Sequence, residues 1–277
     1  MINNCNVAPE RKQAAPAPVN YGPVRQIERG SMNGLRPAKI AMLMAQRIVQ
    51  DALRSGLKPG DMLPAERLML DRYEVARGTL REALRLLEAQ GVVVLKPGPK
   101  GGPMLLNPDP SHLASTLVLL MQLNKAPFRT IVEVRSALEP MICRLAATRM
   151  SGDDLKELHA SVVQMRDHLA DTEIFFDSNR HFHDLIAWSS RNSLFGYLVE
   201  SLLGIVDGTV MGVDYPPDRR KRILLAHEEI YEALARRSGE GAEARMRQHL
   251  AAYVRYAERN HPDLLDQVIP WARTFQQ

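Results

Sequence analysis

Residues 63–106 contain the pattern that most restricts the fold of this chain. LPAERLMLDRYEVARGTLREALRLLEAQG predicts a short helix near 64–72, a tight turn around 73–76 and a second helix from about 77 to 89. Gly91 stands where glycine commonly ends a helix, and VVVLKPGPKGGPMLL then predicts two short strands around a loop of Gly, Pro and Lys. An apolar periodicity from Pro37 to Leu53 adds a helix in front. Three helices followed by a small hairpin indicate a winged helix-turn-helix.

The helix at 77–89 has the two faces that a DNA-reading helix needs. Its apolar stripe consists of Leu80, Ala83, Leu84 and Leu87. The polar side chains that lie off this stripe are Arg77, Thr79, Arg81 and Arg85. Because arginine pairs bidentately with guanine or phosphate, we expect Arg77 and Arg81 to read bases and Thr79 to contact a phosphate. Lys96 and Lys100 flank the Gly-rich loop and are expected to reach the DNA backbone. A solvated helix face would explain any single arginine, but the wing and the basic charge favour DNA binding for the set.

Charge is distributed unevenly along the 277 residues, whose net formal charge is +4. Residues 35–106 carry twelve Lys or Arg and seven Asp or Glu, whereas residues 107–277 carry twenty Lys or Arg and twenty-three Asp or Glu. A basic segment joined to an acidic one indicates a polyanion-binding module attached to a second module. The chain has no apolar run long enough to span a membrane. Its N-terminus is unlike a secretory signal, and its two cysteines are far apart in sequence, so we expect a cytoplasmic protein.

The chain divides by composition into three parts. Residues 1–34 are rich in Pro, Ala, Asn and Gly without apolar periodicity, so we predict a flexible N-terminal arm. The DNA-binding domain is placed at 35–106, and the second domain at 107–277 after a linker at about 107–110. Helices in this second domain are predicted near 111–123, 128–149, 152–170, 173–190, 193–211, 219–237 and 240–260. The expected fold class is mostly α, an N-terminal winged helix-turn-helix plus a C-terminal antiparallel all-helical bundle.

The stretch NRHFHDLIAW at 179–188 places two histidines on opposite faces of one predicted helix. On a helical wheel, Asn179 and His183 share a face with apolar side chains, whereas the opposite face carries Asp177, His181, Asp184 and Trp188. His227 and His249 also lie on apolar faces of two later helices. A lone histidine on such a face is usually a core residue. Three of them on three helices of one bundle indicate a site for a divalent metal ion such as Zn²⁺ or Ni²⁺.

The segment KPGDMLPAERLMLDRYEVARGTLREALRLLEAQGVVVLKPGPKGG resembles the DNA-binding domain of the GntR family of bacterial transcription regulators. The resemblance includes the PG turn, the LPAER start, the RxTxREAL core and the Gly-rich wing. It implies that DNA is contacted by Arg67, Arg77, Thr79, Arg81 and Gly102. Ala76 and Gly78 depart from the hydroxyl residues usual in the family, which removes expected phosphate contacts and an N-cap.

The later segments VRSALEPMICRLAATRM, NRHFHDLIAWSSRN, AHEEIYEAL and MRQHL resemble the FCD effector domain of the FadR-like branch of that family. The resemblance implies a metal held by Asp or Asn, a His four residues later and two further His residues. These positions are Asn179, His183, His227 and His249. Because Asn supplies a neutral oxygen, we expect weaker metal binding than at an Asp site. The resemblance also implies small carboxylate effectors, sometimes bound directly to the metal.

Two further residues are candidates for effector binding. Arg135 shares a helix face with apolar residues and is expected to point inward, where its anionic partner is either Glu139 or an effector carboxylate. Asn192 follows the helix of the histidines, and either caps the next helix or hydrogen-bonds within the pocket. The basic run at 219–222 is interpreted as a solvated helix start.

These patterns together predict a transcription regulator that binds a palindromic operator in double-stranded DNA as a homodimer. The family resemblance implies that the regulator is a repressor. A small carboxylate in the metal-containing bundle is expected to control its operator affinity. One alternative is a metal-sensing regulator, in which the ion itself is the signal. A less favoured one is a metal-dependent hydrolase, because three histidines and an oxygen ligand can activate water. A recognition helix has no purpose in such an enzyme.

Overall fold

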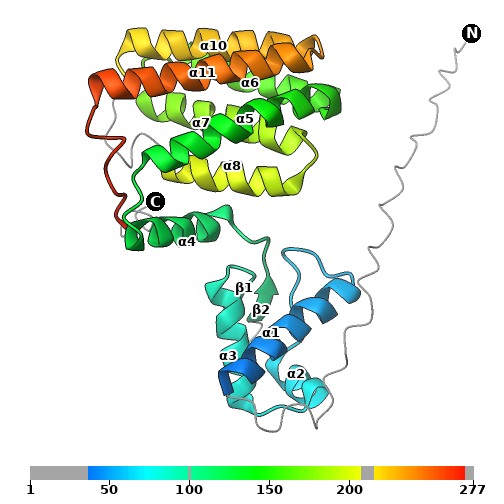
Figure 1. The fold of residues 1–277 in the computed structure, drawn as a ribbon. Coiled ribbons are helices and arrows are strands. Elements are labelled where there is room, and N and C mark those ends of the chain that lie inside the picture. The colour runs from blue at the N-terminus through cyan, green and yellow to red at the C-terminus, as the bar shows by residue number, and fades with distance from the viewer. Residues whose placement is uncertain (1–36, 99–100, 207–214, 272–277) are drawn as a thin grey trace, which may run out of the picture. The chain divides into compact units, whose positions relative to one another are not determined.

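The fold was described from a computed structural model, which covers residues 37–98, 101–206 and 215–271 (Figure 1). The predicted N-terminal arm and Lys100 lie outside these residues. The described chain is mostly helical and contains one two-stranded sheet, so the predicted fold class is confirmed. Among the described residues, 37–56 and 64–86 form one compact unit, and 57–63 together with those from 87 onward form another. The domain limits at 106 and 107 stay a prediction, because the division into units crosses the third helix.

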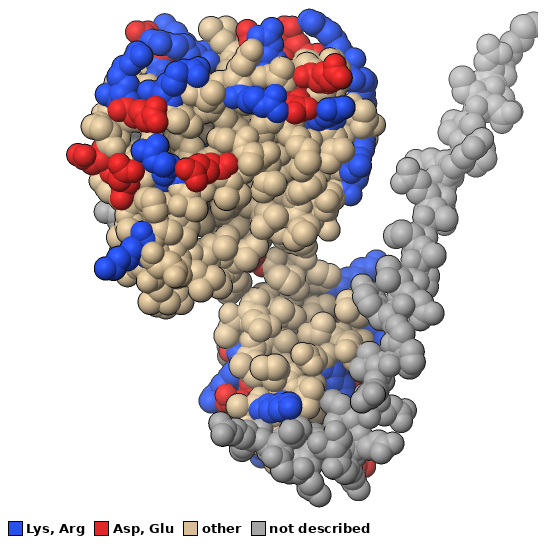
Figure 2. Space-filling model, in the orientation of Figure 1, with Lys and Arg blue, Asp and Glu red and all other residues tan. Residues whose placement is uncertain are grey.

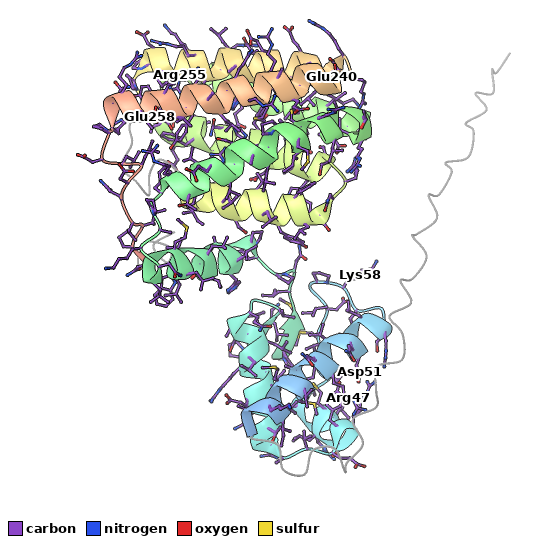
Figure 3. All side chains as sticks on the ribbon, in the orientation of Figure 1. Arg47, Asp51, Lys58, Glu240, Arg255 and Glu258 are labelled. Carbon is purple, nitrogen blue, oxygen red and sulfur yellow. The ribbon has the colours of Figure 1, made fainter. Side chains whose placement is uncertain are left out.

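The first unit is built from α1 (Pro37–Arg54), α2 (Glu66–Tyr73) and most of α3 (Arg77–Ala89). Its buried apolar side chains are Ala41, Met44, Ala45, Ile48, Ala52, Met69, Tyr73, Leu80, Ala83 and Leu84. Glu74 makes the tight turn from α2 to α3 in the left-handed region, with φ 51°. Asp51 on α1 binds Arg72 of α2 with a nitrogen–oxygen distance of 3.2 Å, and Arg47, labelled beside it in Figure 3, lies over the Tyr73 ring. These contacts fix α2 on α1.

The hairpin that follows α3 consists of β1 (Val93–Lys96) and β2 (Gly102–Leu105), paired antiparallel with Val93 opposite Leu105. Gly91 has φ 67°, the left-handed conformation that lets α3 end and the chain turn into β1. The backbone N–H groups of Gly60 and Leu63 donate to β2 carbonyls at 2.8 Å. The hairpin is the predicted wing.

The helical part of the second unit contains seven further helices. They are α4 (Pro110–Leu123), α5 (Arg129–Arg149), α6 (Gly152–Asp167), α7 (Thr172–Ser189), α8 (Ser193–Val206), α10 (Pro217–Ala235) and α11 (Gly239–Asn260). Helix α5 is central, since it packs against α7, α8, α10 and α11 (Figure 1). The pairs α6–α7 and α10–α11 pack on each other, and one apolar core runs through the bundle.

Local sequence explains where several of these helices begin. Asp109 accepts a hydrogen bond from the Ser111 N–H at 2.8 Å, and Pro110 occupies the first turn of α4, so the predicted linker ends as a helix cap. Ser151 and Asp154 form a capping box at α6, and Asp171 caps α7. Within the described ranges, no helix is both long and apolar enough to cross a membrane.

Candidate metal centre and DNA-reading helix

Three buried histidines from three helices converge in the bundle. His183 of α7, His227 of α10 and His249 of α11 are 2%, 0% and 8% exposed. Each offers a ring nitrogen, and these nitrogens all lie within 4.8 Å of one another. The Nε2 atoms of His227 and His249 are 3.4 Å apart, and the Phe182 ring stacks on the His227 ring at 4.0 Å between centroids. The inward orientation predicted for these three side chains is confirmed.

Glu139 of α5 hydrogen-bonds to His183, and Arg135 of the same helix pairs with Glu139. The Nδ1–H group of His183 donates to Glu139 Oε2 at 2.6 Å, and Arg135 Nε donates to the other oxygen of the same carboxylate. Burial alone would raise the pKa of Glu139, but the charge of Arg135 and the contact with His183 outweigh burial and hold that pKa well below its ordinary value. Because an ionised carboxylate only accepts, Nδ1 is the nitrogen of His183 that donates to Glu139, and Nε2 is the ring nitrogen left to face a metal ion.

His227 and His249 have the protonation state that metal ligands require. Burial, followed by the neighbouring histidines, lowers the pKa of His227 well below its ordinary value. Burial and His183 do the same for His249. Neutral imidazoles keep lone pairs, and the Nδ1 atom of His227 is buried without a hydrogen-bond partner among the described residues. This set of donors fits a divalent metal ion.

A cavity of about 50 Å³ adjoins the histidines. Asn179, His183 and His249 line it, and Arg135 lines the same space, whereas His227 is not part of its wall. Asn179 is half-buried and thus lies on the cavity side of α7, as the wheel predicted. Sequence reasoning did not single out the other polar wall residues, Arg180, Tyr215, Arg219 and Tyr253. Tyr253 stands one helical turn after His249, and that spacing is the signal that could have found it.

The opposite face of α7 follows the prediction except at one residue. Asp177 and His181 are exposed and pair with Arg180 and Glu157, at 2.8 and 3.5 Å. Asp184, in contrast, is half-buried, and its Oδ1 atom is buried with no hydrogen-bond partner among the described residues. Burial, and then Glu200 of α8, raises the pKa of Asp184 to about 7. Asp184 belongs to the face that the wheel placed opposite Asn179 and His183, but it is partly covered because α8 packs on α7.

The basic run at the start of α10 also differs from its interpretation as a solvated segment. Arg219 and Arg220 are buried, at 8% and 6% exposed, whereas Lys221 and Arg222 are exposed. Arg220 Nε donates to the Tyr215 carbonyl at 2.7 Å, and the Arg219 guanidinium lies 4.6 Å from the centroid of the Tyr256 ring. Carbonyl groups and an aromatic face thus supply partners that the local sequence does not reveal.

Asn192 caps a helix. Its Oδ1 atom accepts a hydrogen bond from the Leu194 N–H at 3.1 Å, at the start of α8, and Asn192 is not part of the wall of the cavity. The structure therefore shows the capping role of Asn192, in which the side-chain acceptor is engaged by the first turn of α8. An effector-binding role for Asn192 stays a prediction.

Replacing Asn192 by alanine is expected to lower the free energy of unfolding by about 1 kcal/mol, because the backbone N–H group of Leu194 loses its hydrogen-bond acceptor. Denaturation in urea measures this change, and Asn192→Ser, which restores an acceptor, is expected to recover most of it. Metal binding should stay as in the unaltered chain. A loss of metal or carboxylate binding at unchanged stability would instead assign Asn192 a role in the binding pocket.

Helix α3 presents its arginines to solvent. Arg77, Arg81 and Arg85 are exposed, Thr79 is half-buried, and Arg67 of α2 is exposed, while the apolar stripe of α3 is buried. Arg81 Nε pairs with Glu66 Oε1 at 3.0 Å. Gly102 begins β2 with φ 144°, a conformation that favours glycine. The four arginines are therefore exposed, as groups that contact DNA must be.

The helix-turn-helix, the wing and the histidine-bearing bundle define the chain as a winged helix-turn-helix DNA-binding protein with a second, all-helical domain. The family model described as "Bacterial regulatory proteins, gntR family" matches residues 43–99, and the model described as "FCD domain" matches residues 130–252. The chain belongs to the gntR family of bacterial regulatory proteins and carries an FCD domain.

Relatives with known names agree with this membership. The chain is 29% identical over 199 residues to the HTH-type transcriptional regulator LutR of Bacillus subtilis, which covers 70% of this chain and 90% of that protein. It is 26% identical over 192 residues to the galactonate operon transcriptional repressor of Escherichia coli, covering 67% of this chain and 82% of the other. The solved structure of a Streptococcus agalactiae GntR protein has the same fold, with a TM-score of 0.66, 23% identity and coverage of 78% and 100%.

Family membership decides between the predicted classes of protein. The relatives are DNA-binding transcription regulators and not enzymes, so the hydrolase alternative is set aside. Regulators of this family bind DNA operators, typically as dimers. FCD domains can bind metal, in accord with the histidine cluster.

Proposed function

We propose that the protein is a repressor that binds a palindromic operator as a homodimer in the bacterial cytoplasm and is controlled by a small carboxylate. Asn179, His183, His227 and His249 hold a divalent metal ion, Zn²⁺ or Ni²⁺, and the carboxylate binds beside it. The observation that carries the proposal is the convergence of three buried histidines beside a cavity that Arg135 also lines. A relative named as the galactonate operon transcriptional repressor supports the repressor role.

The chemistry of the cavity favours a small anion. When bound, the metal ion supplies a Lewis acid that accepts a carboxylate oxygen. Arg135 is buried and permanently charged, and its pairing with Glu139 keeps the guanidinium at the cavity wall. Tyr215 and Tyr253, which line the same cavity, add hydroxyl donors. A volume of about 50 Å³ suits a carboxylate of a few heavy atoms or one end of a longer acid.

Control of DNA binding follows from a difference in affinity. A carboxylate that binds more tightly to the DNA-free form than to the operator-bound form shifts the population away from the operator. By linkage, operator DNA then weakens carboxylate binding by the same factor. The change in operator affinity caused by the carboxylate and the change in carboxylate affinity caused by the operator are measured independently. Equal factors in the two measurements would confirm the coupling.

The experiment that tests this function is a thermal-shift screen of small carboxylates on metal-loaded protein. Operator DNA is first obtained by selection from random sequences with the same protein. Each carboxylate that raises the melting temperature is then added to the protein–operator complex, and release is expected. If metal alone releases or recruits the operator and no carboxylate acts, the protein is a metal sensor and the carboxylate proposal fails.

Arg135→Lys is expected to weaken carboxylate binding by roughly tenfold, because lysine keeps the charge but loses the planar fork that binds a carboxylate bidentately. Lysine is chosen because alanine would leave Glu139 buried without its cation. The measurement is the carboxylate concentration that releases half of the operator. Arg144→Lys, an exposed arginine on the same helix, serves as the control and should release normally. An unchanged dose response in Arg135→Lys would remove Arg135 from the effector site.

A further inference from the structure

A second hollow, of about 260 Å³, lies between α10 and α11. Its wall contains four arginines and no Asp or Glu of the described chain: Arg219 and Arg222 from α10, and Arg255 and Arg259 from α11. The first turns of α10 and the last turns of α11 contribute these side chains, because the two helices run antiparallel. Figure 2 shows blue Lys and Arg atoms over this end of the helix pair, and Arg255 is labelled in Figure 3.

The arginines of this hollow are not paired with carboxylates of the described protein. Arg222, Arg255 and Arg259 form no ion pair with any described carboxylate. The acidic residue nearest along α11, Glu258, is absent from the wall and pairs instead with Arg129 at 3.4 Å. Guanidinium groups gathered without counter-charges repel one another, so an anion that enters gains from several of them at once.

Arg219 provides an independent indication of an anion site. Its side chain is more than nine-tenths buried, yet its Nε–H group has no hydrogen-bond partner among the described residues. Its remaining contacts are a weak hydrogen bond from Nη2 to the Ala252 carbonyl at 3.4 Å and the Tyr256 ring. Burial lowers the pKa of Arg219, which is the direction expected for a guanidinium group without an ion-pair partner. A buried donor of this kind needs an acceptor.

We propose that the groove between α10 and α11 is a binding site for a phosphate-bearing metabolite, separate from the metal cavity. Phosphate offers several oxygens and up to two negative charges, which match guanidinium groups arriving from two helices. The groove has about five times the volume of the inner cavity, so it accommodates a phosphate ester and not only a bare ion. Arg222, Arg255 and Arg259 belong to the groove alone, whereas Arg219 and His249 line both spaces.

The test is a calorimetric titration of the full-length protein with inorganic phosphate at constant ionic strength, followed by glycerol 3-phosphate. Saturable binding at one site per chain is expected. The double variant Arg222→Gln/Arg255→Gln should bind phosphate at least tenfold more weakly. Arg236→Gln removes the same charge just past the other end of α10, where Arg236 pairs with Glu232, and should bind within twofold of the unaltered chain.

Two further titrations separate this site from the proposed effector site. Protein stripped of metal by a chelator should bind phosphate within twofold of metal-loaded protein. Acetate should not compete. The proposal is overturned if phosphate shows no saturable binding, if the double variant binds normally, or if Arg236→Gln loses as much affinity. It is also overturned if chelation abolishes binding or acetate competes, since the anion then occupies the metal cavity.

Discussion

His183→Ala is expected to lower the affinity for a divalent metal ion by more than 100-fold, while His181→Ala leaves it unchanged. The two residues lie two positions apart on α7, but His183 is 2% exposed within the histidine cluster, whereas the side chain of His181 is 50% exposed. Loss of an outer partner of a metal ligand costs roughly 10- to 100-fold in metal affinity, so loss of a direct ligand should cost more. Metal content after dialysis and competition with a chromogenic chelator measure the difference.

The fold of the His183 variant can be checked separately, because Arg135 still compensates Glu139 when the imidazole is removed. Circular dichroism melting of metal-free protein should therefore show a variant that folds. Stabilisation by added metal should be large in the unaltered chain and in His181→Ala, and nearly absent in His183→Ala. Equal loss of metal in the two variants would refute the assignment of the inward face.

Helical periodicity was enough to predict the histidine cluster, because a wheel depends only on sequence spacing. His183, His227 and His249 each follow the apolar residues of their own helix into the core, and in a bundle all such faces meet. The helix-turn-helix was equally accessible, since the turn, the Gly91 stop and the Gly-rich hairpin are local signals. These parts of the fold are specified within one element or between neighbours in the chain.

Features that depend on packing between distant helices could not be predicted in the same way. A wheel places Asp184 on the outer face of α7, but it does not show that α8 covers that flank and buries the carboxylate. Arg219 and Arg220 have the composition of an exposed run, yet their partners come from residues as distant as Leu169 and Tyr256. The α10–α11 groove arises only when two helix ends, more than thirty residues apart in sequence, are placed together.

Arg77→Ala is expected to abolish specific operator binding while leaving the protein folded. Arg77 begins α3, is exposed and belongs to the polar face of the helix, whose apolar side chains are buried. One bidentate contact with a guanine is worth roughly 1–3 kcal/mol, and a homodimer on a palindrome makes it twice. The loss should therefore be roughly 2–6 kcal/mol, or about 30-fold to more than 10⁴-fold in Kd.

Arg81→Ala should have an effect of the same kind, because Arg81 lies one turn further along the same face. In the DNA-free chain Arg81 pairs with Glu66 in an exposed ion pair, which is worth at most about 1 kcal/mol and so does not prevent its transfer to a base.

The measurement is a titration of selected operator DNA and of an unrelated duplex over a range of salt concentrations. A base contact contributes only to the affinity for operator DNA, so Arg77→Ala should lower that affinity towards the affinity for the unrelated duplex. Arg85→Ala, eight residues further along the exposed face of α3, is the matched control. If Arg85 contacts only phosphate, its replacement weakens both duplexes alike and reduces the salt dependence by about one ion per contact. Unchanged operator preference in Arg77→Ala and Arg81→Ala would show that α3 does not read the operator through these arginines.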